Sequence, residues 1–397
     1  MKNKYLLISP AFPPPLIGGS KVWTYNMVEN SPVSFDILTS KLKPGQNEIV
    51  SDRHNVFRSK YLWDSDGGNP TKFDLLISYS YIIYFVILKY FTHDYNVIVA
   101  GVFDFANGFL FLLGKILGIP VIGLGNAEEF TLSMYGSTFK YKIKKRWMYI
   151  SQKWASGFIV VCDYCGDLLR EIGVNNHPIY IVPSCIDPKK INVIRKEKER
   201  ERGFNIISVG RIVERKGFHD LINAVNLLKQ DIPEIKLTVV GDGPFKPVLD
   251  ALVEKNKMHS YVNLVGKVTD KELSDMYNNS DLFVLAHRML SNGDTEGCPT
   301  VFSEAGAHGI PLIGGNDAGA STAIIDGING FLVDSTNIRL LADKIKQILL
   351  DSDLAKMMAE SAIIKVNKDH MPEVAGNRFY NAINKITEHY YDSRSLD

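Results

Sequence analysis

The sequence predicts an α/β fold with two doubly wound parallel sheets, one in each half of the chain. Short runs rich in β-branched residues alternate with helical patterns, as in KYLLIS, NVIVAG, PVIGLG and GFIVVC of the first half. NIISVG, KLTVVG, LFVLA and PLIGG continue this rhythm in the second half. Such alternation indicates parallel strands joined by helical crossovers, and 397 residues are enough for two domains of this kind.

The composition is that of a globular chain without a strong charge bias. Hydrophobic residues make up 45% and charged residues 22% of the sequence, which favours a buried core over disorder. The formal net charge is +1, so an anionic partner must be held by a local site and nucleic acid is not expected. The four cysteines have no disulfide spacing, which suits a reducing compartment, and we expect a cytoplasmic protein.

Two segments bear on membrane insertion. The amino terminus, MKNKYLLISP, has too short an apolar run for a signal peptide and is predicted to form the first buried strand. The most apolar stretch, Leu75 to Leu88, has 14 residues, fewer than the roughly 20 that span a bilayer. It is therefore predicted to be a buried helix and not a transmembrane segment.

The two domains are predicted to be joined by a linker near residues 185–203. Pro183 and Pro188 punctuate the chain there, and the charge run RKEKERER that follows cannot belong to a buried strand. We therefore assign a first domain to residues 1–190 and a second to residues 191–374.

Glycines at predicted strand ends mark the expected ligand site. Open parallel sheets bind ligands outside the carboxyl ends of their strands. Gly18 and Gly19 follow the first strand, Gly210 follows IISV, and Gly241 begins GDGP. Glycine lets backbone amides approach a phosphate, and the following helix adds its positive end. Turns also require glycine, so each position has a purely structural interpretation too.

Cations follow the strand that ends at Gly210. In VGRIVERKGF, Arg211 and Lys216 lie just past this strand, and Gly217 begins the next predicted helix. An arginine with forked hydrogen bonds and a lysine acting as a point charge can neutralise a diphosphate. Arg215 is a spare cation, and a solvated basic loop is the alternative.

Two glutamates flank a predicted helix start in EGCPTVFSE. Proline is tolerated at a first helical position, so the helix is expected to begin near Pro299. Glu296 then lies in the loop before the helix, and Glu304 about one and a half turns inside it. One carboxylate can face a sugar and the other ribose hydroxyls, while amides near Thr300 and Val301 can anchor donor oxygens. Two acids that only stabilise a helix amino terminus are the alternative.

The order of these motifs resembles the retaining, nucleotide-sugar-dependent family 4 glycosyltransferases, among them phosphatidylinositol mannosyltransferases and lipopolysaccharide core glycosyltransferases. It rests on Gly18-Gly19, VPSCID, VGRIVERKG, VVGDGP, NLVGKVTDKEL, EGCPTVFSEAGAHGIP and DGINGFLV. The resemblance implies the GT-B fold, in which two Rossmann-like domains face each other across a cleft. It also implies that a last helix, at about 375–397, packs back on the first domain.

The same resemblance implies a role for each motif. Arg211 and Lys216 would bind the diphosphate, together with amides of the Gly18-Gly19 loop. Glu296 would contact the transferred sugar, Glu304 the ribose, and Val268 would border the base. No metal ion or other cofactor is expected, because the cations of the chain would hold the leaving diphosphate.

One departure from the family concerns the acceptor side. Family members usually carry a histidine after the strand that corresponds to PVIGLG, and here Gly125 or Asn126 occupies that place. The hydrogen-bond donor near the sugar is then missing or is supplied by Asn126, Glu128 or Glu129. Pro299 lacks an amide hydrogen and so removes one anchor for the donor.

A basic and aromatic segment spans residues 140–154. Between Phe130 and Cys162 the sequence has no acidic residue, and Ile143, Trp147, Ile150 and Trp154 fall on one helical stripe. An ordinary packed helix with a solvated face explains this pattern. The alternative is peripheral contact with an anionic membrane at the inner face of the cell membrane.

The predicted activity is transfer of a sugar from a nucleotide-diphosphate donor to a hydroxyl of a glycan or lipid-linked acceptor, with retention. Cell-surface polysaccharide or glycolipid synthesis is the expected setting. Two alternatives stay open, a nucleotide-sugar epimerase and a donor-binding subunit that does not catalyse. The sugar, the base and the acceptor are not identified by the sequence.

Overall fold

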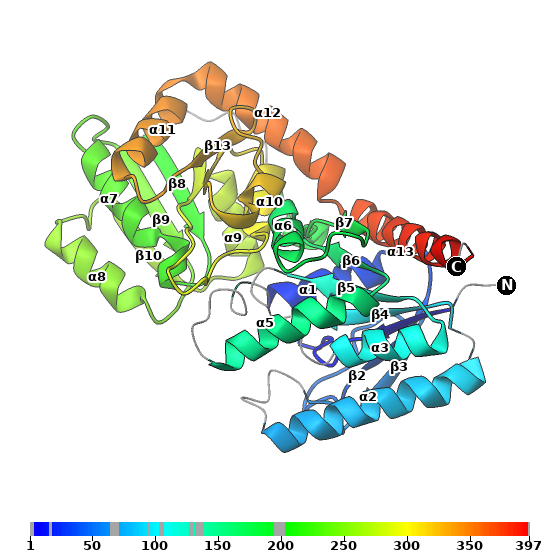
Figure 1. Ribbon diagram of the computed structural model, residues 1–397. Coiled ribbons are helices and arrows are strands. Elements are labelled where there is room, and N and C mark those ends of the chain that lie inside the picture. Colours follow the sequence, from blue (N-terminus) through cyan, green and yellow to red (C-terminus); the bar gives the residue numbers. More distant parts are fainter. Residues whose placement is uncertain are drawn as a thin grey trace. The chain divides into compact units, whose positions relative to one another are not determined.

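The computed structural model describes residues 4–15, 18–63, 71–93, 95–102, 107–126, 131, 139–193 and 203–395. The chain divides into two compact units (Figure 1). Unit 1 comprises Met1–Ser184 and Pro372–Asp397, and unit 2 comprises Cys185–Met371. The first division thus falls after Ser184, whereas the sequence analysis placed it after residue 190.

Unit 1 contains a seven-stranded parallel sheet in the order β3-β2-β1-β4-β5-β6-β7. Its central strands are almost fully buried, as expected for a parallel sheet with helices on both faces. The strands are β1 (Tyr5–Ile8), β2 (Phe35–Ser40), β3 (Asn55–Ser59), β4 (Val97–Val102), β5 (Val121–Gly125), β6 (Gly157–Val160) and β7 (Ile179–Ile181).

The helices of unit 1 cover opposite faces of this sheet. The strand order, with the right-handed crossovers that are the rule for parallel strands, assigns α1 (Gly19–Glu29) to one face. It assigns the other face to α2 (Lys72–His93), α3 (Asn107–Leu117), α5 (Phe139–Ser151) and α6 (Asp163–Glu171), all labelled in Figure 1. The last helix, α13 (Pro372–Arg394), packs against α1. The ring of Phe379 in α13 stacks on Phe35 of β2 at 5.8 Å between centroids, so this helix completes the core of unit 1.

The prediction that Leu75–Leu88 forms a buried helix was wrong. This stretch lies within α2, and only 22% of the most apolar part of α2 is buried. Phe73, Leu76, Tyr84 and Phe91 are exposed, because the helix packs on the sheet through a narrow stripe around Ile82. By length and composition alone α2 could cross a membrane, which for a single helix is weak evidence.

Unit 2 contains a six-stranded parallel sheet in the order β10-β9-β8-β11-β12-β13. Its strands are β8 (Phe204–Val209), β9 (Ile235–Val240), β10 (Val262–Gly266), β11 (Leu282–Leu285), β12 (Leu312–Gly315) and β13 (Gly330–Val333). Its helices are α7 (Phe218–Leu228), α8 (Lys246–Lys255), α9 (Asp270–Asn278), α10 (Thr300–Ala307), α11 (Ile338–Leu350) and α12 (Ser352–Asp369). The predicted fold class, two doubly wound parallel sheets, is confirmed.

Candidate functional site

The sheet of unit 2 has its topological switch point between β8 and β11. Strand β8 pairs with β9 on one side and with β11 on the other, and ligands of open parallel sheets bind outside the carboxyl ends of strands at such a point. The loop after β8 runs to Gly217, which adopts φ 65°. A side chain on Gly217 would collide with the carbonyl of Ala286 at the end of β11, so the two loops touch there.

Lys216 and Glu296 connect these two loops. Nζ of Lys216 lies 3.0 Å from Oε1 of Glu296, and both residues are buried. Lys216 is the last residue of a short 3-10 helix, Glu214–Lys216, that turns its side chain back over the strand end. There Cε of Lys216 would lie 3.4 Å from a Cβ on Gly210, so the lysine covers this glycine.

A second cation shares the Glu296 carboxylate. The guanidinium of Arg215 pairs with Glu296 and, through Nε, with Oδ1 of Asp294 at 3.1 Å. Two cations and two carboxylates therefore compensate one another at the switch point. From the sequence Arg215 is only a spare cation, because neighbouring positions in a loop do not reveal which side chain turns inward.

Arg211 has a different environment from Arg215. Its side chain is exposed, and it makes no ion pair with any residue that the structure describes. Its backbone carbonyl accepts a hydrogen bond from Val213 N–H at 2.9 Å, which fixes the turn after β8. Of the two cations named from the sequence, Lys216 lies beside Glu296, and Arg211 is left as an exposed cation of the same loop.

Burial lowers the pKa of Lys216 to about 7, with the Arg215 cation adding to the shift and Glu304 opposing it. The Glu296 carboxylate, 3.0 Å away, also favours the ammonium form. A buried ammonium with a pKa near neutrality is sensitive to any anion that enters the site, because an added negative charge stabilises its protonated form. The geometry thus suits a lysine that binds a phosphate.

Arg288 holds the two loops together and was missed by the sequence analysis. Its backbone N–H donates to the carbonyl of Arg215 at 2.9 Å. Its guanidinium donates to Oδ2 of Asp220 at 2.7 Å and to Nε2 of His219 at 2.8 Å. The sequence gives little reason to select Arg288, since it is one of several polar residues that follow predicted strands.

Helix α10 begins at Thr300 with Pro299 as its N-cap, which confirms the predicted helix start. Glu304 accepts hydrogen bonds from the hydroxyl of Tyr277 at 3.4 Å and from the side chain of Thr300. Burial raises the pKa of Glu304, while Lys190 and these two hydrogen bonds lower it. The carboxylate is thus fixed in place by its neighbours, and its further lone pairs can accept hydroxyl groups of a ligand.

His287 and His308 are held by hydrogen bonds within unit 2. Nε2 of His287 donates to the carbonyl of Asp317 at 3.0 Å, and Nδ1 accepts from Gly315 N–H at 3.3 Å. Burial lowers the pKa of His287 to about 4, so the ring is neutral and links β11 with β12. Nδ1 of His308 donates to the carbonyl of Glu304 at 2.8 Å and supports the helix that carries this glutamate.

The remaining donor-side residues of unit 2 lie at the edge of the core. Val268 and Val301 are half-buried and pack against the hydrophobic core. Val268 follows β10 and precedes α9, whose first turn is closed by a capping box of Thr269 and Glu272, as the sequence predicted.

The candidate residues of unit 1 are only partly described. Gly18 is the N-cap of α1 with φ 94°, and a Cβ on Gly18 or Gly19 would meet nothing within 4 Å, so this helix end is open. Asn126 directly follows β5, and its buried Nδ2 has no hydrogen-bond partner among the described residues. Glu128 and Glu129 lie outside the residues that the structure describes.

Residues 189–365 match the family described as "Glycosyl transferases group 1". A GDP-mannose-dependent alpha-(1-6)-phosphatidylinositol monomannoside mannosyltransferase of Mycobacterium tuberculosis is 30% identical over 173 residues, 43% of this chain and 45% of that protein. A putative colanic acid biosynthesis glycosyltransferase, WcaL of Escherichia coli K12, is 27% identical over 215 residues, 54% of this chain and 53% of that protein. The chain spans about half the length of these curated relatives.

The solved structure of the lipopolysaccharide outer core galactosyltransferase WaaB is similar over 96% of this chain and 99% of that chain. The TM-score is 0.71 at 16% sequence identity. This likeness confirms the GT-B fold. Together with the family match, it also confirms the resemblance to GT-B glycosyltransferases, and the matched segment carries Lys216, Glu296 and Glu304.

Proposed function

We propose that the chain is a retaining, metal-independent glycosyltransferase that moves a sugar from a nucleotide-diphosphate donor to a hydroxyl acceptor. The single observation that carries the proposal is the buried Lys216–Glu296 pair at the switch point of unit 2. It lies within the segment that matches group 1 glycosyl transferases. The names of the relatives support a setting in cell-surface polysaccharide or glycolipid synthesis.

In this proposal the donor diphosphate exchanges with Glu296 as the partner of Lys216. The pyrophosphate brings negative charge to the loop after β8, where Lys216, Arg215 and the exposed Arg211 supply three cations. Glu296 is then released to accept a hydroxyl of the transferred sugar. Glu304, fixed by Tyr277, accepts ribose hydroxyls about one turn along α10.

The proposed chemical step breaks the bond between the anomeric carbon and the leaving phosphate oxygen. The acceptor oxygen bonds to the same face of that carbon, and the acceptor proton passes to the leaving phosphate oxygen. Negative charge grows on the diphosphate as the bond breaks, so preorganised cations lower the barrier by stabilising it. The amides at the open start of α1 are the contribution proposed for unit 1.

Calorimetric titration with UDP, GDP, ADP and dTDP tests the donor site. We expect one nucleotide to bind selectively, and Lys216→Ala and Glu304→Ala each to weaken its binding. Lys356→Ala, at an exposed position of α12, is the matched control. Binding without sugar transfer to a membrane extract would instead favour a donor-binding subunit, and failure of every nucleotide to bind would contradict the proposal.

We further propose peripheral membrane contact through residues 140–154 of unit 1. Phe139, Ile143 and Ile150 are exposed on α5, although the sequence analysis placed Ile143 and Ile150 on a packed stripe. The same helix exposes Lys142, Lys145 and Arg146. Apolar and basic side chains together suit the interface of an anionic membrane. Flotation with phosphatidylglycerol and phosphatidylcholine vesicles tests this contact, and equal recovery with both lipids would contradict it.

A further inference from the structure

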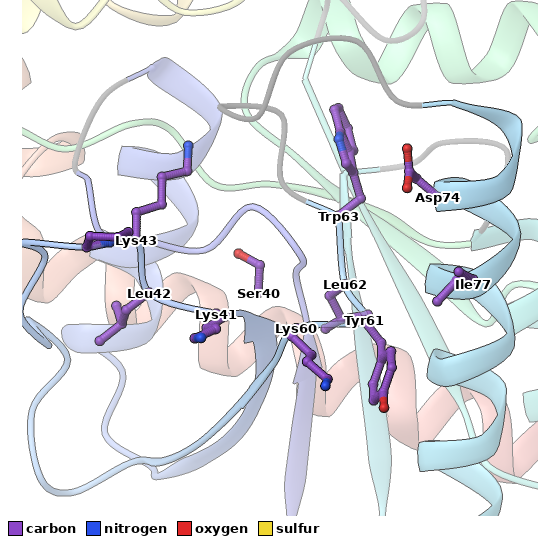
Figure 2. A pocket seen from close by; sticks show the side chains of 11 residues that line it. Ser40, Lys41, Leu42, Lys43, Lys60, Tyr61, Leu62, Trp63, Asp74 and Ile77 are labelled. Atoms are coloured by element: carbon purple, nitrogen blue, oxygen red, sulfur yellow. The ribbon is translucent and has the colours of Figure 1, made fainter.

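A pocket of about 570 Å³ lies in unit 1, and none of its lining residues is assigned to the donor. Its walls are the segments that leave two adjacent parallel strands, residues 40–44 after β2 and residues 60–63 after β3, together with the first turns of α2. Figure 2 shows Lys43 on one side of the pocket and Trp63 with Asp74 on the other, with Ser40 between them. The pocket therefore opens at the carboxyl edge of the sheet, where parallel sheets bind ligands.

Three lysines and one acid line this pocket. The lysines are Lys41, Lys43 and Lys60, and the acid is Asp74, so positive charge is in excess among the described lining residues. Asp74 is already engaged, since its Oδ2 accepts hydrogen bonds from the backbone N–H and the hydroxyl of Thr71 at 3.0 and 2.7 Å. These bonds lower the pKa of Asp74 and fix its charge at the start of α2.

Glu48, the described acid that follows Lys41 and Lys43 in the chain, does not neutralise these lysines either. Glu48 forms an ion pair with Arg58, whose Nε lies 2.7 Å from Oε2 of the carboxylate. Among the described residues no carboxylate forms an ion pair with Lys41, Lys43 or Lys60. Within the described part of the chain the lining therefore keeps an excess of positive charge, whereas the total formal charge of the chain is only +1. Asp64 and Asp66, which follow Trp63, lie outside the described residues.

The other lining groups suit a sugar. Trp63 is half-buried and supplies an aromatic ring to the lining. Tyr61 is 49% exposed, and its ring lies 5.3 Å from the ring of Tyr81 and 5.3 Å from Nζ of Lys60. Ser40 lies at the carboxyl end of β2, and its hydroxyl makes no hydrogen bond to any described residue. Aromatic faces with a few polar groups are the composition of a site for a small polar molecule.

We propose that this pocket binds the anionic group of a saccharide acceptor, a phosphate or carboxylate carried on or beside the sugar. This inference rests on the proposed function in one respect, namely that the bound saccharide is the acceptor of the sugar transfer. The lysines contact the anion, and Trp63 packs on the sugar. A lipid-linked phosphosugar and a soluble anionic saccharide offer the same chemistry, and the experiment separates them.

Binding is followed by tryptophan fluorescence, with Trp63→Phe to identify the signal that comes from the pocket. The probes are glucose 1-phosphate, neutral glucose, and vesicles of phosphatidylglycerol or phosphatidylcholine. We expect glucose 1-phosphate or the phosphatidylglycerol vesicles to change the Trp63 signal, while glucose and phosphatidylcholine do not. A response to glucose 1-phosphate identifies a soluble source of the anion, and a response to vesicles alone identifies a lipid headgroup.

The triple variant Lys41→Ala/Lys43→Ala/Lys60→Ala should weaken this binding by about tenfold or more, because charge-assisted contacts are lost. The corresponding triple arginine variant should restore it. Lys255→Ala/Arg339→Ala/Lys356→Ala removes the same charge from exposed positions of unit 2 and should have no effect. Failure of both anionic probes to bind, or equal binding by the triple alanine variant, would overturn the proposal.

Nucleotide binding by the triple alanine variant separates this inference from the proposed function. It should equal that of the unchanged protein, because none of the three lysines is among the residues assigned to the donor. Loss of anion binding with intact nucleotide binding supports the pocket alone. Nucleotide binding that is absent from every protein would contradict the proposed function and leave the fluorescence result to decide the pocket.

Discussion

Cationic side chains have opposite environments in the two units of this protein. At the switch point of unit 2, Lys216 and Arg215 are buried or nearly so and paired with Glu296 and Asp294. In the pocket of unit 1, three lysines lie at the surface, and the acid beside them is engaged by Thr71. A buried cation needs an anionic partner in the protein without ligand, whereas an exposed cation is stabilised by water.

Removal of the buried lysine gives the largest expected effect. Lys216→Ala should lower sugar transfer on the order of 100-fold or more, because a preorganised cation in a dry site contributes several kcal/mol to a charged transition state. Initial rates of donor turnover with a membrane acceptor extract measure the change. Lys229→Ala, at the end of α7, serves as a control that should keep its activity. Near-normal turnover by Lys216→Ala would remove this lysine from the mechanism.

The next largest effect is expected on stability, from a substitution at the contact between the two loops of unit 2. Gly217→Ala places a side chain at φ 65° against the carbonyl of Ala286, and we expect a loss of about 2 kcal/mol or more in unfolding free energy. Gly266→Ala is matched to it, because Gly266 has φ 85° but a Cβ there meets nothing within 4 Å. Urea unfolding that gave equal losses for both variants would show that the loops do not press on each other.

The pH dependence of nucleotide binding reports the charge of Lys216. Its pKa is lowered to about 7, so the ammonium form that attracts a diphosphate is lost from the empty protein as the pH rises above 7. Nucleotide affinity should therefore fall between about pH 7 and pH 9, by up to about tenfold per pH unit. Calorimetry at each pH measures the slope, which Lys216→Ala should abolish. A slope that survives this substitution would assign the titration to another group.

The lowered pKa also affects stability. In the unfolded chain Lys216 binds its proton up to a much higher pH than in the folded protein. The unfolded state thus holds more protons between about pH 7 and pH 10, and the unfolding free energy should rise with pH across this window on account of this group. The same site therefore loses nucleotide affinity while it gains stability.

The smallest expected effect is a difference in salt dependence between ligand binding at the exposed lysines of unit 1 and at the buried Lys216 of unit 2. Raising the salt from about 0.05 to about 0.5 M screens exposed charges strongly and buried ones less. Anion binding at Lys41, Lys43 and Lys60 should weaken several-fold, and nucleotide binding at Lys216 by a smaller factor. Parallel fluorescence and calorimetric titrations give the two slopes. Equal slopes would mean that the two sites do not differ in burial when they are occupied.

Features that depend on neighbouring residues could be predicted from the sequence. Alternating apolar runs and helical segments predicted both parallel sheets, and the capping box at Thr269 and the helix start near Pro299 were found from a few letters. Local backbone preference decides such features, so a short stretch of sequence is sufficient to predict them.

Which side chains come into contact depends on the tertiary structure. Arg215 and not Arg211 pairs with Glu296 because the loops after β8 and β11 close on each other at Gly217, about eighty residues apart in the chain. Helix α2 has an apolar sequence yet lies largely exposed, and the lysine pocket gathers two strand ends about twenty residues apart. Burial and pairing depend on such distant contacts, and no local pattern of residue types records them.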